Sequence, residues 1–311
     1  MQALGHAIVD RILFRPRPIE LAHNPYDRSA REALAETLFD TLDNEQPLGT
    51  VGRGRLLLKI IEQGHPTQKL AAAYFQNLQL LLKDRTRRSV PGRVLLGLGT
   101  GRSGSTSLTA LFATVDDSCC THENPPLIYW VPEKEQVQFH MKRFALLADY
   151  FSFVSDVSHW WLNALDSFFE NFPDSKVVGV YRDIDTCTKS FMRIKRYGRQ
   201  SWNHWVPFGT GVWSSHSWDP TYPTYPIAGR PLNPDRTKYE LIARYVRAYN
   251  ERLARLASER PNQVLLIKTE QLSEPHTQME LFNFAGVRGR IAEFKLNVRS
   301  VSDGIATVYK F

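Results

Sequence analysis

A glycine-rich turn after an apolar run has the residue types of an anion-binding loop. Residues 94–108 read VLLGLGTGRSGSTSL, in which the apolar run leads through glycines and small hydroxyl residues into a helical pattern. Gly99, Gly101 and Gly104 let the backbone turn sharply and bring successive N–H groups toward one point. The helix that follows adds the positive end of its dipole. The stretch therefore predicts a phosphate-binding loop at the end of a strand.

The loop departs from the usual nucleotide phosphate loop where a lysine is expected. The spacing from Gly99 to Gly104 fits G-x-x-x-x-G, but Ser105 and Thr106 follow where lysine and then serine or threonine would stand. A kinase places that lysine on the nucleotide phosphates, usually with Mg²⁺. The cation of this loop is instead Arg102, inside the turn. A kinase of altered loop chemistry is one alternative. A non-catalytic nucleotide-binding scaffold, with the N-terminal region as its working part, is another.

A second candidate phosphate contact follows a later strand. The apolar run KVVGVY at 176–181 leads into RDIDTCTKSF, in which Ser190 stands eight residues after Arg182. Arg182 at the strand end can fork onto a phosphate, and Ser190, two turns into the next helix, offers a hydroxyl. An arginine and aspartate after a strand are by themselves more often structural. In combination with the loop they predict a second phosphate contact.

The two motifs together resemble those of sulfotransferases that use 3′-phosphoadenosine 5′-phosphosulfate (PAPS). R-S-G-S-T at 102–106 is similar to the 5′-phosphosulfate loop of the branches that carry arginine there, and the strand with Arg182 and Ser190 is similar to the 3′-phosphate signature. FENFPDSKVVGVYRD and VLLIKTEQLSEPHTQMELFNFAGV extend the likeness over roughly residues 93–287. It implies transfer of a sulfuryl group from PAPS to a hydroxyl or amine, without a metal ion, and release of adenosine 3′,5′-bisphosphate.

The resemblance also implies which residues bind the donor. Some members of the family fold a basic C-terminal loop over the nucleotide, which adds Arg299 as a candidate. The 3′-phosphate is assigned to Arg182 and Ser190. The 5′ end is assigned to Gly101, Arg102, Ser103, Gly104, Ser105, Thr106 and Ser107.

Transfer further needs a base that takes the proton of the acceptor. Glu123 in CTHENPP lies 21 residues after Arg102, and the arginine-loop branches resemble this in placing a catalytic glutamate after the first helix. A partly buried carboxylate can serve as the base, although a glutamate before two prolines can also simply cap a turn. His122 could orient the acceptor, and His159 lies near the place of the histidine that cytosolic branches use. Glu123 is the preferred base, and His159 is the alternative.

The apolar pattern predicts the strands and helices that must position these residues. Strands are expected at 94–99, 151–155, 176–181 and 264–268, and helices between them at 105–114, 133–148, 159–171, 186–195 and 237–258. Helix-length crossovers between strands predict an α/β fold, a three-layer and mostly parallel sheet flanked by helices. The resemblance implies that this is the P-loop-like sulfotransferase fold. Ligands of such a sheet bind at the carboxyl ends of the strands, where both motifs lie.

The chain is predicted to divide near residue 90. Residues 1–90 show only helical spacing, at 29–43, 51–63 and 70–81, and are expected to form a helical extension to an α/β domain at 91–311. The stretch 200–236 has neither periodicity and is expected to be a long loop or lid over the acceptor. Its aromatic residues would suit a ring-bearing small molecule or a carbohydrate as acceptor. They are Trp202, Trp205, Trp213, Trp218, Tyr222 and Tyr225.

Composition limits the remaining classes of protein. The 311 residues are 42% hydrophobic, and 39 Lys and Arg against 32 Asp and Glu give a net charge of +7, which favours an anionic partner. The basic clusters RTRRS and RIKRYGR fall in no nucleic-acid motif, so no specific nucleic acid is expected. No run approaches about 18–20 apolar residues and the N-terminus lacks a signal core, so we expect a cytoplasmic protein without membrane contact. Cys119, Cys120 and Cys187 are too few for a disulfide framework and are expected to be buried thiols.

Overall fold

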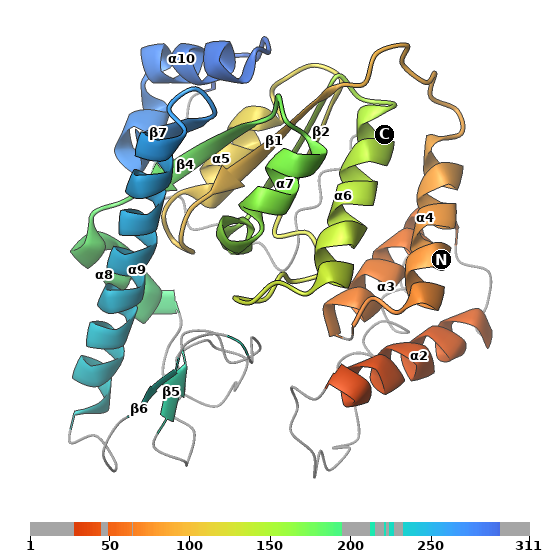
Figure 1. Ribbon diagram of the computed structural model, residues 1–311, viewed down its shortest axis with the longest axis horizontal. Coiled ribbons are helices and arrows are strands. Elements are labelled where there is room, and N and C mark those ends of the chain that lie inside the picture. The colour runs from red at the N-terminus through yellow and green to blue at the C-terminus, as the bar shows by residue number, and fades with distance from the viewer. Residues whose placement is uncertain are drawn as a thin grey trace. The chain divides into compact units, whose positions relative to one another are not determined.

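The computed structural model describes residues 28–44, 49–63, 65–194, 212–214, 221, 224–226 and 233–292. These residues form two compact units, whose elements are labelled in Figure 1. The first unit comprises the described residues up to 87 together with 125–127 and 134–143. The second comprises 88–124, 128–133 and the described residues from 144 onward, so it contains both candidate phosphate motifs.

The first unit is built from helices. α2 (Arg28–Asn44), α3 (Thr50–Gln63) and α4 (Gln68–Leu82) lie where the apolar spacing predicts helices, and residues 134–143 are the first part of α6 (Lys134–Ala148). Thr67 caps α4 by accepting a hydrogen bond from the N–H of Leu70 at 3.3 Å. The rings of Tyr74, Phe75 and Phe139 pack together with centroids 5.0–5.4 Å apart. An aromatic cluster therefore holds α4 to the start of α6.

The second unit is organised around a five-stranded parallel sheet with the order β2-β3-β1-β4-β7. The strands are β1 (Arg93–Leu98), β2 (Ser118–His122), β3 (Phe153–Val157), β4 (Lys176–Tyr181) and β7 (Val264–Lys268). Val177, Val178 and Val180 of β4 are fully buried, as expected for a strand covered on both faces. All four predicted strands are confirmed, and β2 is an additional strand that the apolar pattern did not predict.

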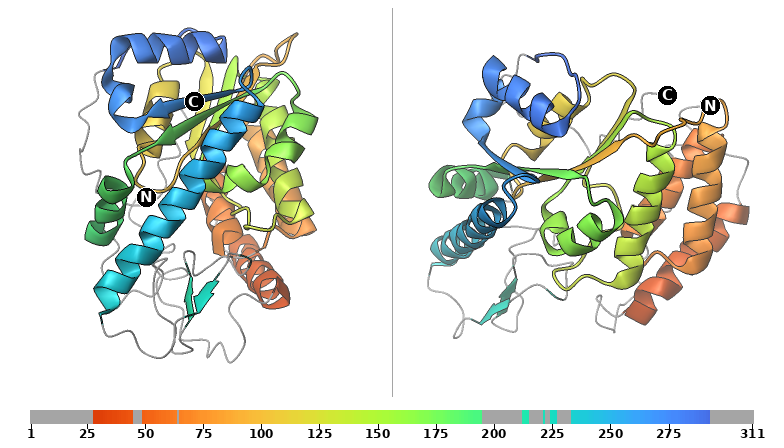
Figure 2. Two further views of the ribbon diagram at one scale, coloured as in Figure 1. Left: turned by 60° about the vertical axis from the view of Figure 1, so that its left-hand side comes forward. Right: turned by 45° about the horizontal axis from the view of Figure 1, so that its top comes forward.

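Helices cover both faces of this sheet, which gives the predicted three layers. α5 (Ser105–Phe112) and α10 (Pro275–Ala285) lie on one face, and α7 (Leu165–Asn171) and α9 (Pro234–Glu259) lie on the other, as the right-hand view of Figure 2 shows. α8 (Ile184–Ile194) follows β4 and contacts α9. Side chains of the strands, α5 and α10 form one apolar core, which includes Leu95, Leu108, Phe112, Phe153, Val178, Leu281 and Phe282.

The long helix α9 follows directly from its sequence. Asn233 caps its start by accepting a hydrogen bond from the N–H of Arg236 at 3.0 Å, and Pro234 occupies the first turn, where no N–H is needed. The predicted apolar stripe is confirmed, because Ile242, Tyr245, Tyr249 and Leu253 are at most 2% exposed. The stripe places Tyr249 on the buried side of α9.

Two segments differ from the prediction. The helix predicted at 159–171 is divided at Ala164 into a 3-10 helix, η1 (His159–Asn163), and α7. The Trp161 indole donates to the buried carboxylate of Asp156 at 2.6 Å, and this local bond fixes η1 in its tighter geometry. Within the predicted lid, β5 (Val212–Ser214) and β6 (Thr224–Pro226) pair antiparallel. Trp202, Trp205, Trp218 and Tyr222 lie outside the described residues.

The cysteine prediction is confirmed. Cys119, Cys120 and Cys187 are all buried and free. Burial raises the pKa of the Cys120 and Cys187 thiols to about 11, so both remain protonated at neutral pH. Across the helices that the structure describes, none combines the length and the apolar character that a membrane crossing needs.

Candidate active site

The loop between β1 and α5 turns back tightly on itself. Ser103 holds the turn, because its N–H and its hydroxyl both donate to the carbonyl of Thr100, at 3.2 and 2.6 Å. Arg102 and Gly104 have φ values of +70° and +92°, in the left-handed region. At Gly104 a Cβ atom would lie 2.8 Å from Thr269 Cγ2, so only glycine fits there without displacement. The loop ends at the N-terminus of the eight-residue helix α5, as an anion-binding turn requires.

Thr269 connects this loop to the neighbouring strand. It is the first residue of the 3-10 helix η2 (Thr269–Ser273), which follows β7. Its hydroxyl lies 2.5 Å from the carbonyl of Ser103 and 3.1 Å from the carbonyl of Tyr181, the last residue of β4. One buried hydroxyl thus bridges the two segments that carry the phosphate motifs. No pattern in the sequence predicts this role, because an isolated threonine after a strand has many uses.

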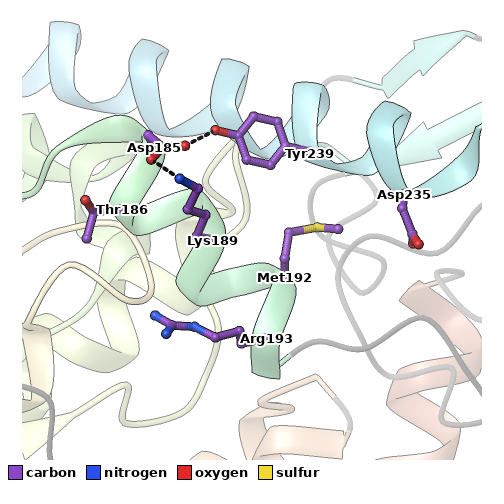
Figure 3. A pocket seen from close by; sticks show the side chains of 7 residues that line it. All are labelled: Asp185, Thr186, Lys189, Met192, Arg193, Asp235 and Tyr239. Atoms are coloured by element: carbon purple, nitrogen blue, oxygen red, sulfur yellow. Dashed lines mark hydrogen bonds and ion pairs between the residues drawn. The ribbon is translucent and has the colours of Figure 1, made fainter.

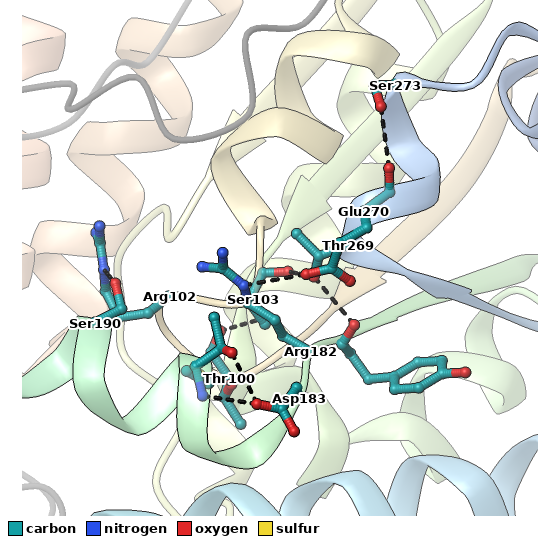
Figure 4. A network of polar contacts seen from close by, with 12 residues as sticks. Thr100, Arg102, Ser103, Arg182, Asp183, Ser190, Thr269, Glu270 and Ser273 are labelled. Carbon is teal, nitrogen blue, oxygen red and sulfur yellow. Dashed lines mark hydrogen bonds and ion pairs between the residues drawn. The ribbon is translucent and has the colours of Figure 1, made fainter.

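Arg102 and Ser190 bring the two motifs into direct contact. Arg102 Nε donates to Ser190 Oγ at 3.3 Å, and Ser190 lies on α8 at 6% exposure (Figure 4). The Cys187 thiol, one turn earlier on α8, donates to the carbonyl of Gly101 at 3.5 Å. The loop after β1 and the helix after β4 therefore meet at one edge of the sheet.

Arg182 stands at the end of β4, as predicted. Its Nε donates to Glu270 Oε1 at 3.3 Å (Figure 4). Its carbonyl accepts a hydrogen bond from the Asn250 side chain at 3.2 Å. The Arg182 side chain is 16% exposed, whereas that of Glu270 is 56% exposed. An ion pair with such an exposed partner contributes little free energy. A phosphate can therefore replace Glu270 as the partner of Arg182 at small cost.

The pKa of the Arg102 guanidinium is lowered by its surroundings. Arg102 is an exposed residue, yet desolvation of its guanidinium by neighbouring atoms is the main cause that lowers its pKa. The positive charges of Arg182 and Arg193 lower the pKa further, while Cys187 and the carboxylate of Glu123 oppose the change. Three guanidinium groups and Glu123 thus lie within electrostatic reach of one another.

The two candidate bases contact each other. Glu123 follows β2 and His159 follows β3, and these strands are paired from Ser118 to His122. Glu123 Oε1 lies 3.5 Å from His159 Nδ1. The Glu123 N–H donates to the carbonyl of Val157 at 3.1 Å, and Glu123 itself has a φ of +49°, which is uncommon for a non-glycine residue. The backbone of Glu123 is therefore held against β3, and the carboxylate of its side chain, which is 41% exposed, lies beside the imidazole.

His122 has a different partner. Its Nε2 lies 3.0 Å from the hydroxyl of Ser105, the first residue of α5. This contact joins β2 to the helix N-terminus at the end of the loop after β1. Ser105 is buried, whereas Thr106 beside it is exposed and Ser107 is partly exposed. Arg299 lies outside the described residues.

Asp156 is a buried residue of the site that sequence reasoning missed. It is fully buried in β3 and accepts hydrogen bonds from Thr121 Oγ1 at 2.5 Å, Trp161 Nε1 at 2.6 Å and the N–H of Asn124 at 3.4 Å. These bonds fix the chain next to both Glu123 and His159. The available signal was an aspartate inside the otherwise strand-like run FVSDV, since a carboxylate is rarely buried without dedicated partners.

Comparison with known proteins identifies the family. The sequence model of the sulfotransferase domain matches residues 94–275, a range that includes the loop, Glu123, His159, Arg182 and Ser190. A crystal structure of a sulfotransferase from Alicyclobacillus acidocaldarius aligns with a TM-score of 0.40 and 15% identity, covering 68% of this chain and 88% of that one. No curated protein matches the sequence. Since the domain match spans more than half of the 311 residues, the chain belongs to the sulfotransferase family.

Proposed function

We propose that the protein transfers a sulfuryl group from PAPS to a hydroxyl or amine of a small-molecule or carbohydrate acceptor. The observation that carries this proposal is the contact between Arg102 Nε and Ser190 Oγ at 3.3 Å. The two residues come from motifs 88 positions apart in the sequence, each suited to one phosphate. Their contact supports one site that spans both ends of a doubly phosphorylated adenosine.

The residues present fit such a nucleotide. The N–H groups of residues 101–106 and the Arg102 guanidinium would hold the 5′ end, at the start of α5. Arg182 and Ser190 would hold the 3′-phosphate, with Arg182 exchanging Glu270 for the phosphate. Desolvation is the main cause of the lowered pKa of Arg102, and the charges of Arg182 and Arg193 add to it. An anion bound among these arginines would offset their mutual repulsion.

The protein supplies a base and a cation for the transfer. PAPS, when bound, provides the sulfuryl group, and its bond to the 5′-phosphate breaks as the acceptor oxygen or nitrogen attacks the sulfur. Glu123 takes the proton of the acceptor, and His159 at 3.5 Å holds the carboxylate in place. Arg102 and the loop N–H groups offset the negative charge that develops on the 5′-phosphate oxygen. His159 as the base, with Glu123 as its partner, is the alternative assignment.

Ligand-dependent melting tests the proposal against a kinase. A ligand at about 100 times its Kd adds about 2.7 kcal/mol to the free energy of unfolding and raises the melting temperature. We expect adenosine 3′,5′-bisphosphate to raise it in the presence of EDTA, and ATP to raise it much less. A rise with ATP that requires Mg²⁺, and none with the bisphosphate, would support the kinase. Transfer of label from ³⁵S-PAPS to an acceptor panel separates the enzyme from a non-catalytic scaffold.

A further inference from the structure

Arg193 lies on the same side of α8 as Ser190. It follows Ser190 by three positions, and residues at this spacing are neighbours on a helix surface. The Arg102 guanidinium reaches this side of α8, because Arg102 Nε is 3.3 Å from Ser190 Oγ. The charge of Arg193 also acts on Arg102 and contributes to the lowering of its pKa. Arg193 is therefore a third cation beside the two proposed phosphate contacts.

Lys189 and Arg182 both have carboxylate partners, whereas Arg193 has none among the described residues. Lys189, one turn before Arg193, lies 2.6 Å from Asp185, which also accepts the Tyr239 hydroxyl at 2.5 Å. Arg182 pairs with Glu270. Figure 3 shows the Asp185, Lys189 and Tyr239 contacts together, with the Arg193 side chain extending away from α8 and apart from them.

Arg193 also borders open space. It lines a cavity of about 630 Å³ between α8 and the start of α9 (Figure 3). The other lining residues are Asp185, Thr186, Lys189, Met192, Asp235 and Tyr239. Its exposed guanidinium can therefore turn toward a ligand without displacing packed side chains. A planar guanidinium can give two parallel hydrogen bonds to one phosphate, which the ammonium of Lys189 cannot do.

We propose that Arg193 is a further nucleotide-binding residue, which contacts the 3′-phosphate of the donor beside Ser190 and makes the site selective for nucleotides that carry this second phosphate. The inference rests on the proposed function. The 3′-phosphate is a dianion, and one of its two assigned contacts, Arg182, has a charge that is partly offset by Glu270. Arg193 supplies a further positive charge that no carboxylate of the described residues pairs with.

Calorimetric titration of Arg193→Gln tests the inference. We expect the Kd of adenosine 3′,5′-bisphosphate to rise about 10- to 100-fold, as for the loss of hydrogen bonds to a charged group. The Kd of adenosine 5′-monophosphate should change less than about twofold, because this ligand lacks the 3′-phosphate. Arg193→Lys, which keeps the charge but loses the fork, should fall between the wild type and Arg193→Gln. Lys189→Gln is the matched control on the same helix, and it should leave both affinities unchanged.

Three outcomes would overturn the inference while leaving the proposed function intact. They are an unchanged Kd for the bisphosphate in Arg193→Gln, an equal loss for both nucleotides, and an equal loss in Lys189→Gln. An equal loss for both nucleotides would indicate that Arg193 acts through its long-range electrostatic field rather than through contact with the 3′-phosphate. Such an effect is screened by salt. Failure of the proposed function looks different, because the wild-type protein would then show no preference for the bisphosphate over the monophosphate.

Discussion

At the scale of single residues, the two candidate bases are carried on constrained backbone. Glu123 keeps a left-handed backbone conformation while its carboxylate lies 3.5 Å from His159. The phenol of Tyr249 donates to the carbonyl of His159 at 2.8 Å and is itself buried, so the backbone that carries the imidazole is also fixed. Such strain persists only where the surrounding structure requires it. The paired side chains are therefore the place to test the chemistry.

Glu123→Gln should lower kcat for sulfuryl transfer by about 100- to 10,000-fold, because the amide cannot take the proton of the acceptor. The Kd of adenosine 3′,5′-bisphosphate should change little, since Glu123 is not assigned to the nucleotide. His159→Asn is the informative comparison. It should lower kcat less than Glu123→Gln does, because it leaves the Glu123 carboxylate in place. If Glu123→Gln keeps the wild-type rate while His159→Asn abolishes transfer, His159 is the base and the assignment is reversed.

Thr269→Val should destabilise the protein and weaken nucleotide binding together. Valine keeps the branched shape but removes the hydroxyl that approaches the carbonyls of Ser103 and Tyr181. We expect a loss of about 1–3 kcal/mol in urea denaturation and a higher Kd for the bisphosphate. Thr109→Val serves as the control. It removes a hydrogen bond within α5, which the Thr109 hydroxyl donates to the carbonyl of Ser105 at 3.1 Å. Equal Kd values in Thr269→Val and the wild type would mean that Thr269 does not shape the loop.

Residues that belong to a sequence motif are easier to predict than the residues whose hydrogen bonds hold the motif in place. Arg102, Arg182 and Ser190 stand out because glycines and strand ends mark their positions in the sequence. Thr269, Asp156 and Tyr249 act through bonds to backbone groups or side chains that are distant in the sequence or packed from other elements. A single sequence carries no record of such pairings, and the contact between Glu123 and His159 was likewise not predicted.

At the scale of elements, the apolar period located most helices and strands but not β2. The run Ser-Cys-Cys-Thr-His has no alternation and few β-branched residues, so the intrinsic strand signal is weak. Its register against β3, with Cys120 opposite Ser155, is set by tertiary pairing. The break between η1 and α7 has the same origin, because the Trp161 bond to Asp156 overrides a continuous helical period.

The helix α6 contributes a pH-sensitive group to the first unit. His140 is fully buried, and desolvation, followed by the charge of Arg143, lowers its pKa well below the ordinary value. The unfolded chain therefore binds a proton below about pH 6.5 that the folded chain does not, so the free energy of unfolding falls as the pH is lowered. The slope for one such group approaches about 1.4 kcal/mol per pH unit.

Urea denaturation between about pH 7.5 and pH 5.5 measures this effect, in a window above the titration of most carboxylates. Wild-type protein should lose stability on acidification. His140→Gln should flatten the dependence, since glutamine does not titrate and can still donate to the carbonyl of Pro126, which His140 Nε2 approaches at 2.7 Å. A slope equal to that of the wild type in this variant would exclude His140 as its source.

At the scale of the whole molecule, the apolar pattern of the sequence predicts the α/β class, whereas tertiary packing determines which strands are neighbours. The helix-length spacing between the strands is enough to predict a parallel α/β sheet. The strand order β2-β3-β1-β4-β7, which the structure shows, places the ends of β1 and β4 side by side. That adjacency brings two motifs separated by 88 residues into contact, as sharing one ligand would require. Residues before 94 fall outside the sulfotransferase match, and their helices follow from apolar spacing alone.

The central claim is that both phosphate motifs bind a single nucleotide. A crystal structure with adenosine 3′,5′-bisphosphate tests it most directly. We predict one bound molecule, with its 5′-phosphate on the N–H groups of residues 101–106 and its 3′-phosphate within about 3.2 Å of Arg182 and Ser190. A nucleotide that engages only one motif and leaves the other in solvent, or one that binds away from both, would contradict the account.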